Sequence, residues 1–189
     1  ALNLGIIKAR GEIVVLCHQD VLFYENWIDM LFERIVEVEN RTKKWGVLGT
    51  AGITVREDTV GVVHNIKGSL QWQASKRLKV CSVQTVDEHC MIIRKSSGLR
   101  FDSEIFNGFH FYGPDICLNS LNKGFMNFGI LCPLVHGSKS SSLISGKKEF
   151  MRLLNALAKK WRSKFPHIRT PTSVIRKRSV QTFVRFNNG

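Results

Sequence analysis

The sequence predicts an α/β fold in which a mixed, mainly parallel sheet is flanked by helices. Three observations predict it. The chain has 189 residues with 43% apolar content, which is enough for a substantial core. Helix-like and strand-like patterns alternate through its first half, which favours a sheet covered by helices over a sandwich or a helical bundle. An apolar run at residues 12–17 stops abruptly at His18-Gln19-Asp20, as a buried strand of such a sheet would.

The elements of the first half follow from their periodicity. Residues 2–9 have helical spacing and stop at Arg10-Gly11, and residues 12–17 form the apolar strand. Residues 26–40 form an amphipathic helix, because Trp27 and Leu31 fall on one face while Asp29 and Glu33 fall on another. Further strands are expected at residues 45–54, 61–64, 78–83 and 87–94.

The second half is less regular. A short helix is expected at 115–121, closed by Lys123-Gly124, and a strand at 125–134 leads into Val135-His136. The Ser-rich residues 139–146 separate a body, residues 1–146, from a basic segment, residues 147–189. In that segment an amphipathic helix is expected to end at Pro166, and the rest is expected to be extended or disordered.

The basic charge is concentrated in the C-terminal segment. Residues 147–189 hold twelve Lys and Arg against one acid, or +11 of the net charge of +13. Such a segment can meet nucleic acid, an anionic membrane or an acidic partner. Nucleic acid is not favoured, because the chain has no RNP-like aromatic motif and no zinc-finger spacing. The helix within 147–165 either packs on the body or lies on an anionic membrane surface. No segment reaches the about 20 apolar residues of a membrane span.

Asp20 is the first candidate site residue. It follows a buried strand, and a carboxylate at that place suits a hard divalent cation such as Mg²⁺ or Mn²⁺. An aspartate that only begins a turn is the alternative. His136, at the end of a second apolar strand, is either a hydrogen-bonding histidine or a second ligand facing Asp20. His64, His89 and His167 have no recognisable partners and are interpreted as structural or surface residues.

The loop at residues 102–115 is the second candidate. It gathers aromatic residues, two glycines, a histidine and several acids in a short stretch without periodicity, and such loops more often bind than merely connect. Asp115 opens the helix that follows the loop. It is either the N-cap of that helix or a general base, which would need partial burial to raise its pKa.

In order along the chain, these pieces resemble family-2-type glycosyltransferases with the A-type nucleotide-sugar fold. The resemblance covers about residues 1–140 and is closest to a subgroup with His-Gln-Asp in place of the Asp-x-Asp metal motif. The matching segments are Asn3-Leu4-Gly5-Ile6, Ala9-Arg10-Gly11-Glu12, His18-Gln19-Asp20-Val21, His110-Phe111-Tyr112-Gly113-Pro114-Asp115-Ile116-Cys117-Leu118 and Pro133-Leu134-Val135-His136. Two departures are His18 in the metal motif and Tyr112-Gly113 where many relatives carry Glu-Asp.

The resemblance implies a metal-dependent, inverting transfer of a sugar from a nucleoside diphosphate sugar to a hydroxyl acceptor. Asp20 and His136 would hold Mn²⁺ or Mg²⁺, with Asn3 and Gln19 as further donor contacts. Asp115 would be the base. The acceptor cleft would take Asp87, Glu88, His110 and Tyr112.

The resemblance also implies an acceptor that is a saccharide, a lipid-linked molecule or a protein, and a place in polysaccharide or glycoconjugate synthesis. The location would be cytoplasmic, with peripheral membrane contact through residues 147–165. The chain corresponds to the C-terminal two-thirds of such a catalytic domain, so the nucleotide-binding part that precedes it in the family has no counterpart here. The alternative is a non-catalytic module that binds nucleic acid or an anionic membrane through its basic tail.

Overall fold

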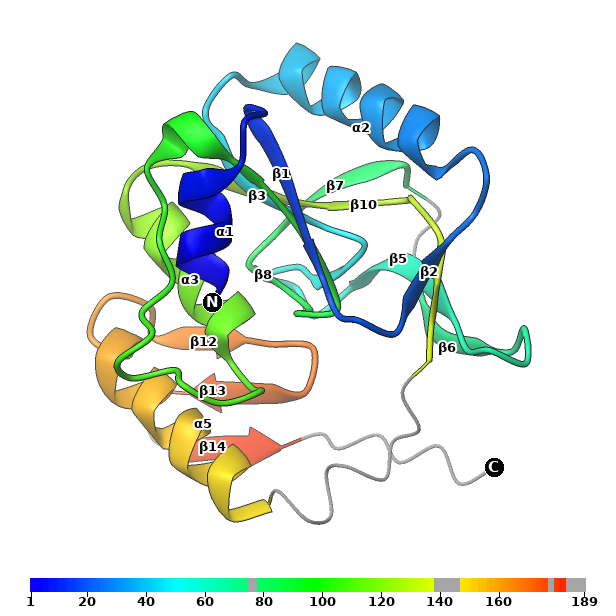
Figure 1. Ribbon diagram of the computed structural model, residues 1–189. Coiled ribbons are helices and arrows are strands. Elements are labelled where there is room, and N and C mark those ends of the chain that lie inside the picture. Colours follow the sequence, from blue (N-terminus) through cyan, green and yellow to red (C-terminus); the bar gives the residue numbers. More distant parts are fainter. Residues whose placement is uncertain (75–77, 138–146, 177–178, 183–189) are drawn as a thin grey trace.

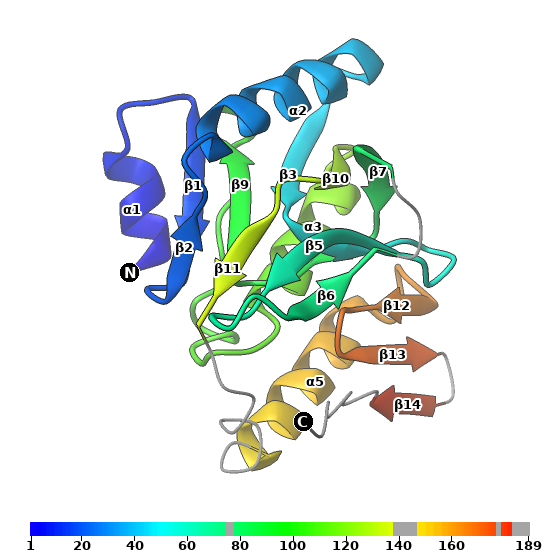
Figure 2. The same cartoon turned by 90° about the vertical axis from the view of Figure 1, so that its right-hand side faces the viewer.

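The main sheet has five strands in the order β1-β9-β3-β10-β7 (Figure 1 and Figure 2). Their bounds are Ile13–Cys17, Cys90–Arg94, Trp45–Gly49, Met126–Ile130 and Val80–Val83. This is a computed structural model, and it describes residues 1–74, 78–137, 147–176 and 179–182. The architecture is mixed α/β, as the alternating sequence pattern predicted.

Helices cover both faces of the main sheet. Helix α2 (Trp27–Arg41) lies on one face, and α1 (Leu2–Lys8) and α3 (Tyr112–Asn122) lie on the other (Figure 1). Because side chains alternate along a strand, neighbouring residues enter different cores. Leu48 packs in the α2 core, whereas Val47 packs in the α1 and α3 core. The residues of both cores are buried. Because the main sheet is covered on both faces, its strands consist of continuous apolar runs in the sequence.

A second sheet continues from the end of the first. Its strands are ordered β2-β11-β5-β4-β8, and β6 pairs with β5. Their bounds are Val21–Phe23, Leu134–His136, Thr59–His64, Ala51–Ile53, Thr85–Val86 and Leu70–Gln73. The predicted strand at 45–54 is thus divided between the two sheets as β3 and β4, at Thr50. The short strands β2, β6 and β8 were not predicted.

The prediction of a mainly parallel sheet was wrong. Only β3 with β10 and β5 with β11 are parallel among the strand pairs of the described residues, and the others are antiparallel. A parallel pair needs a long crossover, usually through a helix, whereas short connections give antiparallel neighbours. Short connections account for antiparallel pairs of consecutive strands, such as β4 and β5, which are joined by residues 54–58.

The C-terminal segment is also more ordered than predicted. Helix α5 (Lys147–Trp161) is followed by β12 (His167–Arg169), β13 (Ser173–Arg176) and β14 (Ser179–Thr182), which form an antiparallel sheet (Figure 2). The expectation of an extended or disordered tail is therefore corrected for the described residues. The sequence pattern did not predict this sheet because its buried apolar residues are few and are surrounded by polar and basic ones. They are Ile168, Val174 and Ile175.

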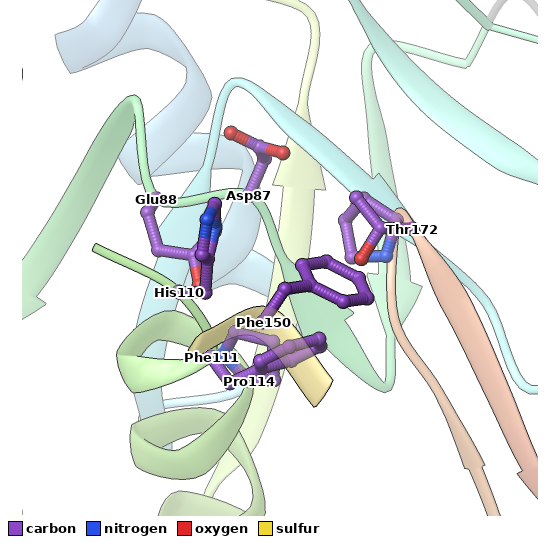
Figure 3. A pocket seen from close by; sticks show the side chains of 8 residues that line it. Asp87, Glu88, His110, Phe111, Pro114, Phe150 and Thr172 are labelled. Atoms are coloured by element: carbon purple, nitrogen blue, oxygen red, sulfur yellow. The ribbon is translucent and has the colours of Figure 1, made fainter. Parts of the chain in front are cut away.

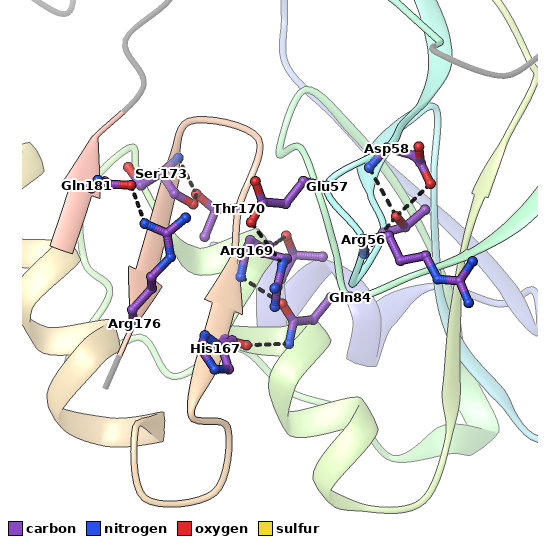
Figure 4. Close-up of polar contacts among 12 residues, drawn as sticks. Arg56, Glu57, Asp58, Gln84, His167, Arg169, Thr170, Ser173, Arg176 and Gln181 are labelled. Atoms are coloured by element: carbon purple, nitrogen blue, oxygen red, sulfur yellow. Dashed lines mark hydrogen bonds and ion pairs between the residues drawn. The ribbon is translucent and has the colours of Figure 1, made fainter. Parts of the chain in front are cut away.

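The segment is attached to the body by a third core and by hydrogen bonds. Leu154, Leu157 and Trp161 of α5 pack with Phe111 and Leu118 of the body. Gln84 Nε2 donates to the His167 carbonyl at 2.8 Å, and its Oε1 accepts from the Arg169 amide at 2.6 Å (Figure 4). The predicted boundary at residue 146 lies outside the described residues. Within the described residues, no helix combines the length and apolarity needed to cross a bilayer.

Candidate active site

Strand pairing brings the ends of two distant strands together. His18 and Asp20 follow β1, and His136 ends β11. Strand β11 runs antiparallel to β2 with His136 opposite Val21, which places it beside Asp20. The Gly137 amide then donates to the Asp20 carbonyl at 2.8 Å. The structure therefore unites the predicted ligands Asp20 and His136, and adds His18.

These three side chains form a group that can hold a metal ion. Each offers one ligand atom, and the three atoms lie within 4.8 Å of one another. His136 Nε2 is 3.3 Å from His18 Nδ1 and 3.4 Å from Asp20 Oδ1. Atoms bound to one ion at about 2.1 Å lie about 3 to 3.5 Å apart, so these separations match a shared cation. We call these residues the triad.

The triad is held in a state suited to ligation. The second ring nitrogen of His18, Nε2, is 3.0 Å from the Tyr112 hydroxyl, which fixes the orientation of the ring. Burial lowers the pKa of His18, although the negative charges of Asp87 and Asp20 act to raise it. Burial, followed by the charge of His89, also lowers the pKa of His136. Both imidazoles are therefore neutral at pH 7, the form that binds metals.

Residues that precede β9 extend this arrangement. Because β9 runs antiparallel to β1, its beginning meets the end of β1, and the His18 amide donates to the His89 carbonyl at 3.0 Å. His89 is 3% exposed, and its ring centre is 5.4 Å from that of His136. Its Nδ1 is 2.7 Å from Asp87 Oδ1, and its Nε2 is 2.8 Å from Thr50 Oγ1. His89, for which the sequence showed no recognisable partner and which was interpreted as structural or surface, is therefore a buried residue with two side-chain partners.

The sequence contained a signal for this second cluster. Asp87, Glu88 and His89 are three titratable residues placed directly before a buried strand, much as His18-Gln19-Asp20 is placed directly after one. Burial raises the pKa of Asp87, but the hydrogen bonds and charge of His89 outweigh it and hold that pKa well below its usual range. Asp87 is therefore ionised, and its negative charge acts on both His18 and His136.

A small pocket adjoins these residues (Figure 3). Its volume is about 20 Å³, which holds one water molecule or one hydroxyl group. The carboxylates Asp87 and Glu88 line it with His110, and the remaining lining residues are Phe111, Pro114, Phe150, Pro171 and Thr172. Three of the four residues predicted for the acceptor cleft therefore line one pocket. The fourth, Tyr112, faces His18 instead.

Glu88 is the unusual group of this pocket. Its Oε1 is buried and has no hydrogen-bond partner among the described residues. Burial, reinforced by the charge of Asp87, raises the pKa of Glu88 to about 8, although the backbone amides of Phe111 and Gly113 act in the opposite direction. Strong pKa shifts of this kind, caused by desolvation and a charged neighbour, are common at functional sites.

Asp115 is not part of this arrangement, which corrects its predicted role as the base. It is 1% exposed and does not line the pocket. Its carboxylate accepts from Trp161 Nε1 at 2.6 Å and pairs with Lys160 Nζ at 2.8 Å. It is not a helix cap either, because α3 begins at Tyr112 after Phe111 and has no side-chain cap. Asp115 instead joins α3 to α5.

The two predicted donor contacts, Asn3 and Gln19, are neither members of the triad nor lining residues of the pocket. Asn3 Nδ2 donates to the Phe101 carbonyl, and its Oδ1 accepts from the Phe101 amide, both at 2.8 Å. Asn3 thus ties α1 to the segment that follows β9, and its assignment as a donor contact stays a prediction. Gln19 lies between His18 and Asp20 and is exposed to solvent.

Comparison with known proteins gives a partial relationship. No protein-family model matches the chain. It is 28% identical over 162 residues to a protein from Fuscovulum blasticum named "ATP synthase subunits region ORF 6". The match covers 84% of this chain and 63% of that relative, so the chain spans less than two-thirds of the relative's length.

Proposed function

We propose that this chain carries the metal-dependent core of an inverting glycosyltransferase. It would transfer a sugar from a nucleoside diphosphate sugar to a hydroxyl acceptor in polysaccharide or glycoconjugate synthesis. The observation that carries the proposal is the convergence of His18, Asp20 and His136 at the ends of two strands, beside a pocket lined by carboxylates. The ordered motifs of the sequence support the same reaction and an A-type nucleotide-sugar fold.

The donor set of the triad favours Mn²⁺ over Mg²⁺. Mg²⁺ prefers oxygen ligands and retains several waters, whereas the triad offers two imidazole nitrogens and one carboxylate. Mn²⁺ accepts both kinds of donor. Bound there, the ion would neutralise the charge that develops on the departing diphosphate. The triad therefore fits the cofactor that the family resemblance implies.

The surrounding residues have distinct tasks in this proposal. Tyr112 orients His18 through its hydroxyl, and the ionised Asp87 fixes His89 beside His136. Phe111 and Phe150 form an apolar wall of the pocket and limit the entry of water. Because Phe150 belongs to α5, the C-terminal segment completes the pocket as well as the third core.

The acceptor and the location remain parts of the proposal. A saccharide, a lipid-linked molecule or a protein can supply the hydroxyl, and the enzyme would act on the cytoplasmic side. Peripheral membrane contact through residues 147–165 would have to use exposed basic side chains. The apolar face of α5 is already buried, with Leu153, Leu154 and Leu157 fully inaccessible, so it cannot enter a membrane without leaving the body.

Metal binding and donor cleavage test the proposal together. Mn²⁺ binding is measured by electron paramagnetic resonance, and nucleotide release is followed with UDP-glucose and GDP-mannose as probes. The unaltered chain should bind Mn²⁺ and release nucleotide only when the metal is present, and Asp20→Ala should lose both. Glu25→Gln, at an exposed position, is the control. Full activity in Asp20→Ala contradicts the assignment. An inactive chain that binds nucleic acid or anionic vesicles in a strongly salt-dependent way supports the alternative binding module.

A further inference from the structure

We infer that Glu88 is the general base that takes the proton from the acceptor hydroxyl. The inference rests on the proposed function and names the catalytic carboxylate of that same site. It is carried by a contrast among the acids near the pocket. Asp87 and Asp115 each have strong partners, whereas Glu88 has a buried oxygen without one among the described residues.

The position of Glu88 suits this task. Glu88 is one of the residues that line a pocket large enough for one hydroxyl group, and its Oε1 is buried and has no hydrogen-bond partner among the described residues. A buried carboxylate oxygen without a partner is costly, and an acceptor hydroxyl group that enters beside Glu88 and reaches this oxygen would satisfy it. The base must lie within hydrogen-bond reach of the proton that it removes, and a pocket of this size brings the two groups together.

The neighbouring carboxylates are committed to other contacts. Asp87 accepts from the His89 ring at 2.7 Å and from the His89 amide at 3.1 Å, and its pKa is held well below the usual range. It is therefore a poor proton acceptor. Asp115 is bound to Trp161 and Lys160 and lies outside the pocket lining.

The proton affinity of Glu88 also matches the role. Its pKa is raised to about 8, first by burial and then by the charge of Asp87. A general base works best when its pKa lies near the operating pH, because it is then ionised in a useful fraction of molecules and still binds a proton strongly. Asp87 thus has an indirect effect, since its fixed charge increases the basicity of its neighbour.

Gly113 provides the space in which Glu88 lies. A Cβ at position 113 would be 2.9 Å from Glu88 Cγ and 3.2 Å from Met91 Sδ, which is closer than real Cβ contacts allow without movement. Tyr112, the residue before this glycine, contacts His18 of the triad. The backbone at 112–113 therefore links the position of the base to the position of the metal ligands.

The proposed step is balanced as follows. The acceptor O–H bond breaks, and its proton moves to the Glu88 carboxylate. The acceptor oxygen forms a bond to the anomeric carbon of the donor sugar. The bond from that carbon to the phosphate oxygen breaks, and the nucleoside diphosphate leaves with the electron pair.

The test compares two nucleophiles, one that needs a base and one that does not. Nucleotide release from UDP-glucose and GDP-mannose is measured with Mn²⁺, first with water as the acceptor and then with azide, which has no proton to lose. Glu88→Gln should lower the reaction with water at least about 100-fold, while the reaction with azide stays within about threefold of the unaltered chain. Its affinity for Mn²⁺ should not change.

Three variants complete the design. Glu88→Asp retains a carboxylate and should recover part of the reaction with water, whereas Gly113→Ala should displace Glu88 and reproduce the loss. Glu104→Gln removes an exposed carboxylate from the neighbouring loop and should have no effect. If the unaltered chain cleaves a donor and Glu88→Gln retains its rate with water, or loses the azide reaction equally, the inference fails alone. If the unaltered chain cleaves neither donor, the proposed function fails as well.

Discussion

Two polar clusters in this molecule use similar side chains in opposite ways. The anchor consists of Asp115, Lys160 and Trp161, and it joins α3 to α5. The triad and its pocket lie at the strand ends, and there Glu88 Oε1 is buried without a partner in the part of the chain that the structure describes. The carboxylate of the anchor is held by Trp161 and Lys160, whereas Glu88 of the site has an oxygen with no hydrogen-bond partner among the described residues.

This difference separates structural from functional acids better than burial alone does. Asp115 is nearly inaccessible, and burial raises its pKa against the effects of Lys160 and Trp161, so a criterion based on burial would select it as a base. Its contacts with Trp161 and Lys160 show instead that it has a structural role. A group that must receive a proton or an ion needs a vacant lone pair, and the anchor leaves none directed at the pocket.

Disrupting the anchor should have the largest effect on stability. Asp115→Ala leaves the buried Trp161 Nε1 without its acceptor and removes one partner of Lys160, so we expect a loss of about 3 kcal/mol in the free energy of unfolding. Urea denaturation measures it. At temperatures where Asp115→Ala is still folded, its affinity for Mn²⁺ should equal that of the unaltered chain. Asp102→Ala, which removes the more exposed partner of Lys160, should cost less than 1 kcal/mol, about the value of a surface pair.

Disrupting the triad should affect metal binding and leave stability nearly unchanged. Asp20→Ala removes the only carboxylate of the triad, and we expect the dissociation constant for Mn²⁺ to rise at least about 100-fold. Isothermal titration calorimetry measures it, and denaturation of the metal-free chain should shift by less than about 1 kcal/mol. Gln19→Ala, at the exposed residue between the two ligands, is the matched control. A comparable loss in that variant would contradict the assignment of the ligands.

The raised pKa of Glu88 should be visible in stability. In the unfolded chain this carboxyl group ionises near pH 4.5, and in the folded chain near pH 8. Between these values the unfolded state has lost the proton and the folded state has not, so the contribution of Glu88 falls as pH rises and is constant above about 8. Histidines with lowered pKa values act with the opposite sign in part of this range. The difference between the unaltered chain and Glu88→Gln therefore isolates the effect, which we expect to be a fall of up to about 1.4 kcal/mol per pH unit between these two values.

The smallest effect should come from the residue that orients the triad. Tyr112→Phe removes the hydroxyl that contacts His18 Nε2 and leaves the ring in place, and we expect Mn²⁺ affinity to fall about tenfold. Tyr24→Phe removes a similar hydroxyl from the exposed contact with His64 and should change nothing. Equal affinities for the two variants would show that Tyr112 does not support the triad.

The parts of the fold that depend on local periodicity could be predicted from the sequence. Helix α2 was predicted because its apolar residues recur at helical spacing, and β1 because its apolar run ends at a polar triplet. The sheet β12-β13-β14 was not, since its residues become buried only when α5 covers them. The relative directions of the strands could not be predicted either. They depend on which strands pair, and most neighbours in the main sheet are not consecutive in sequence.

The candidate site shows the same limit. Asp20 and His136 were predicted from their positions after strands, and the pairing of β2 with β11 brings them together. The role of Asp115 was misjudged because its partner Trp161 lies 46 residues away, a contact that no local pattern reveals. Glu88 was assigned to the acceptor cleft, but its unpartnered oxygen depends on the packing of the loop at 110–113 and could not be predicted.

The geometry of the triad has a consequence for the stability of the folded chain. His18 and His136 are 118 residues apart in sequence, so an ion held by both would act as a reversible crosslink that closes most of the body into a loop. Such a crosslink opposes separation of β2 from β11. At a free Mn²⁺ concentration of 100 times the dissociation constant, it would add about 2.7 kcal/mol to the free energy of unfolding. The free concentration of Mn²⁺ would then set the stability of the folded chain.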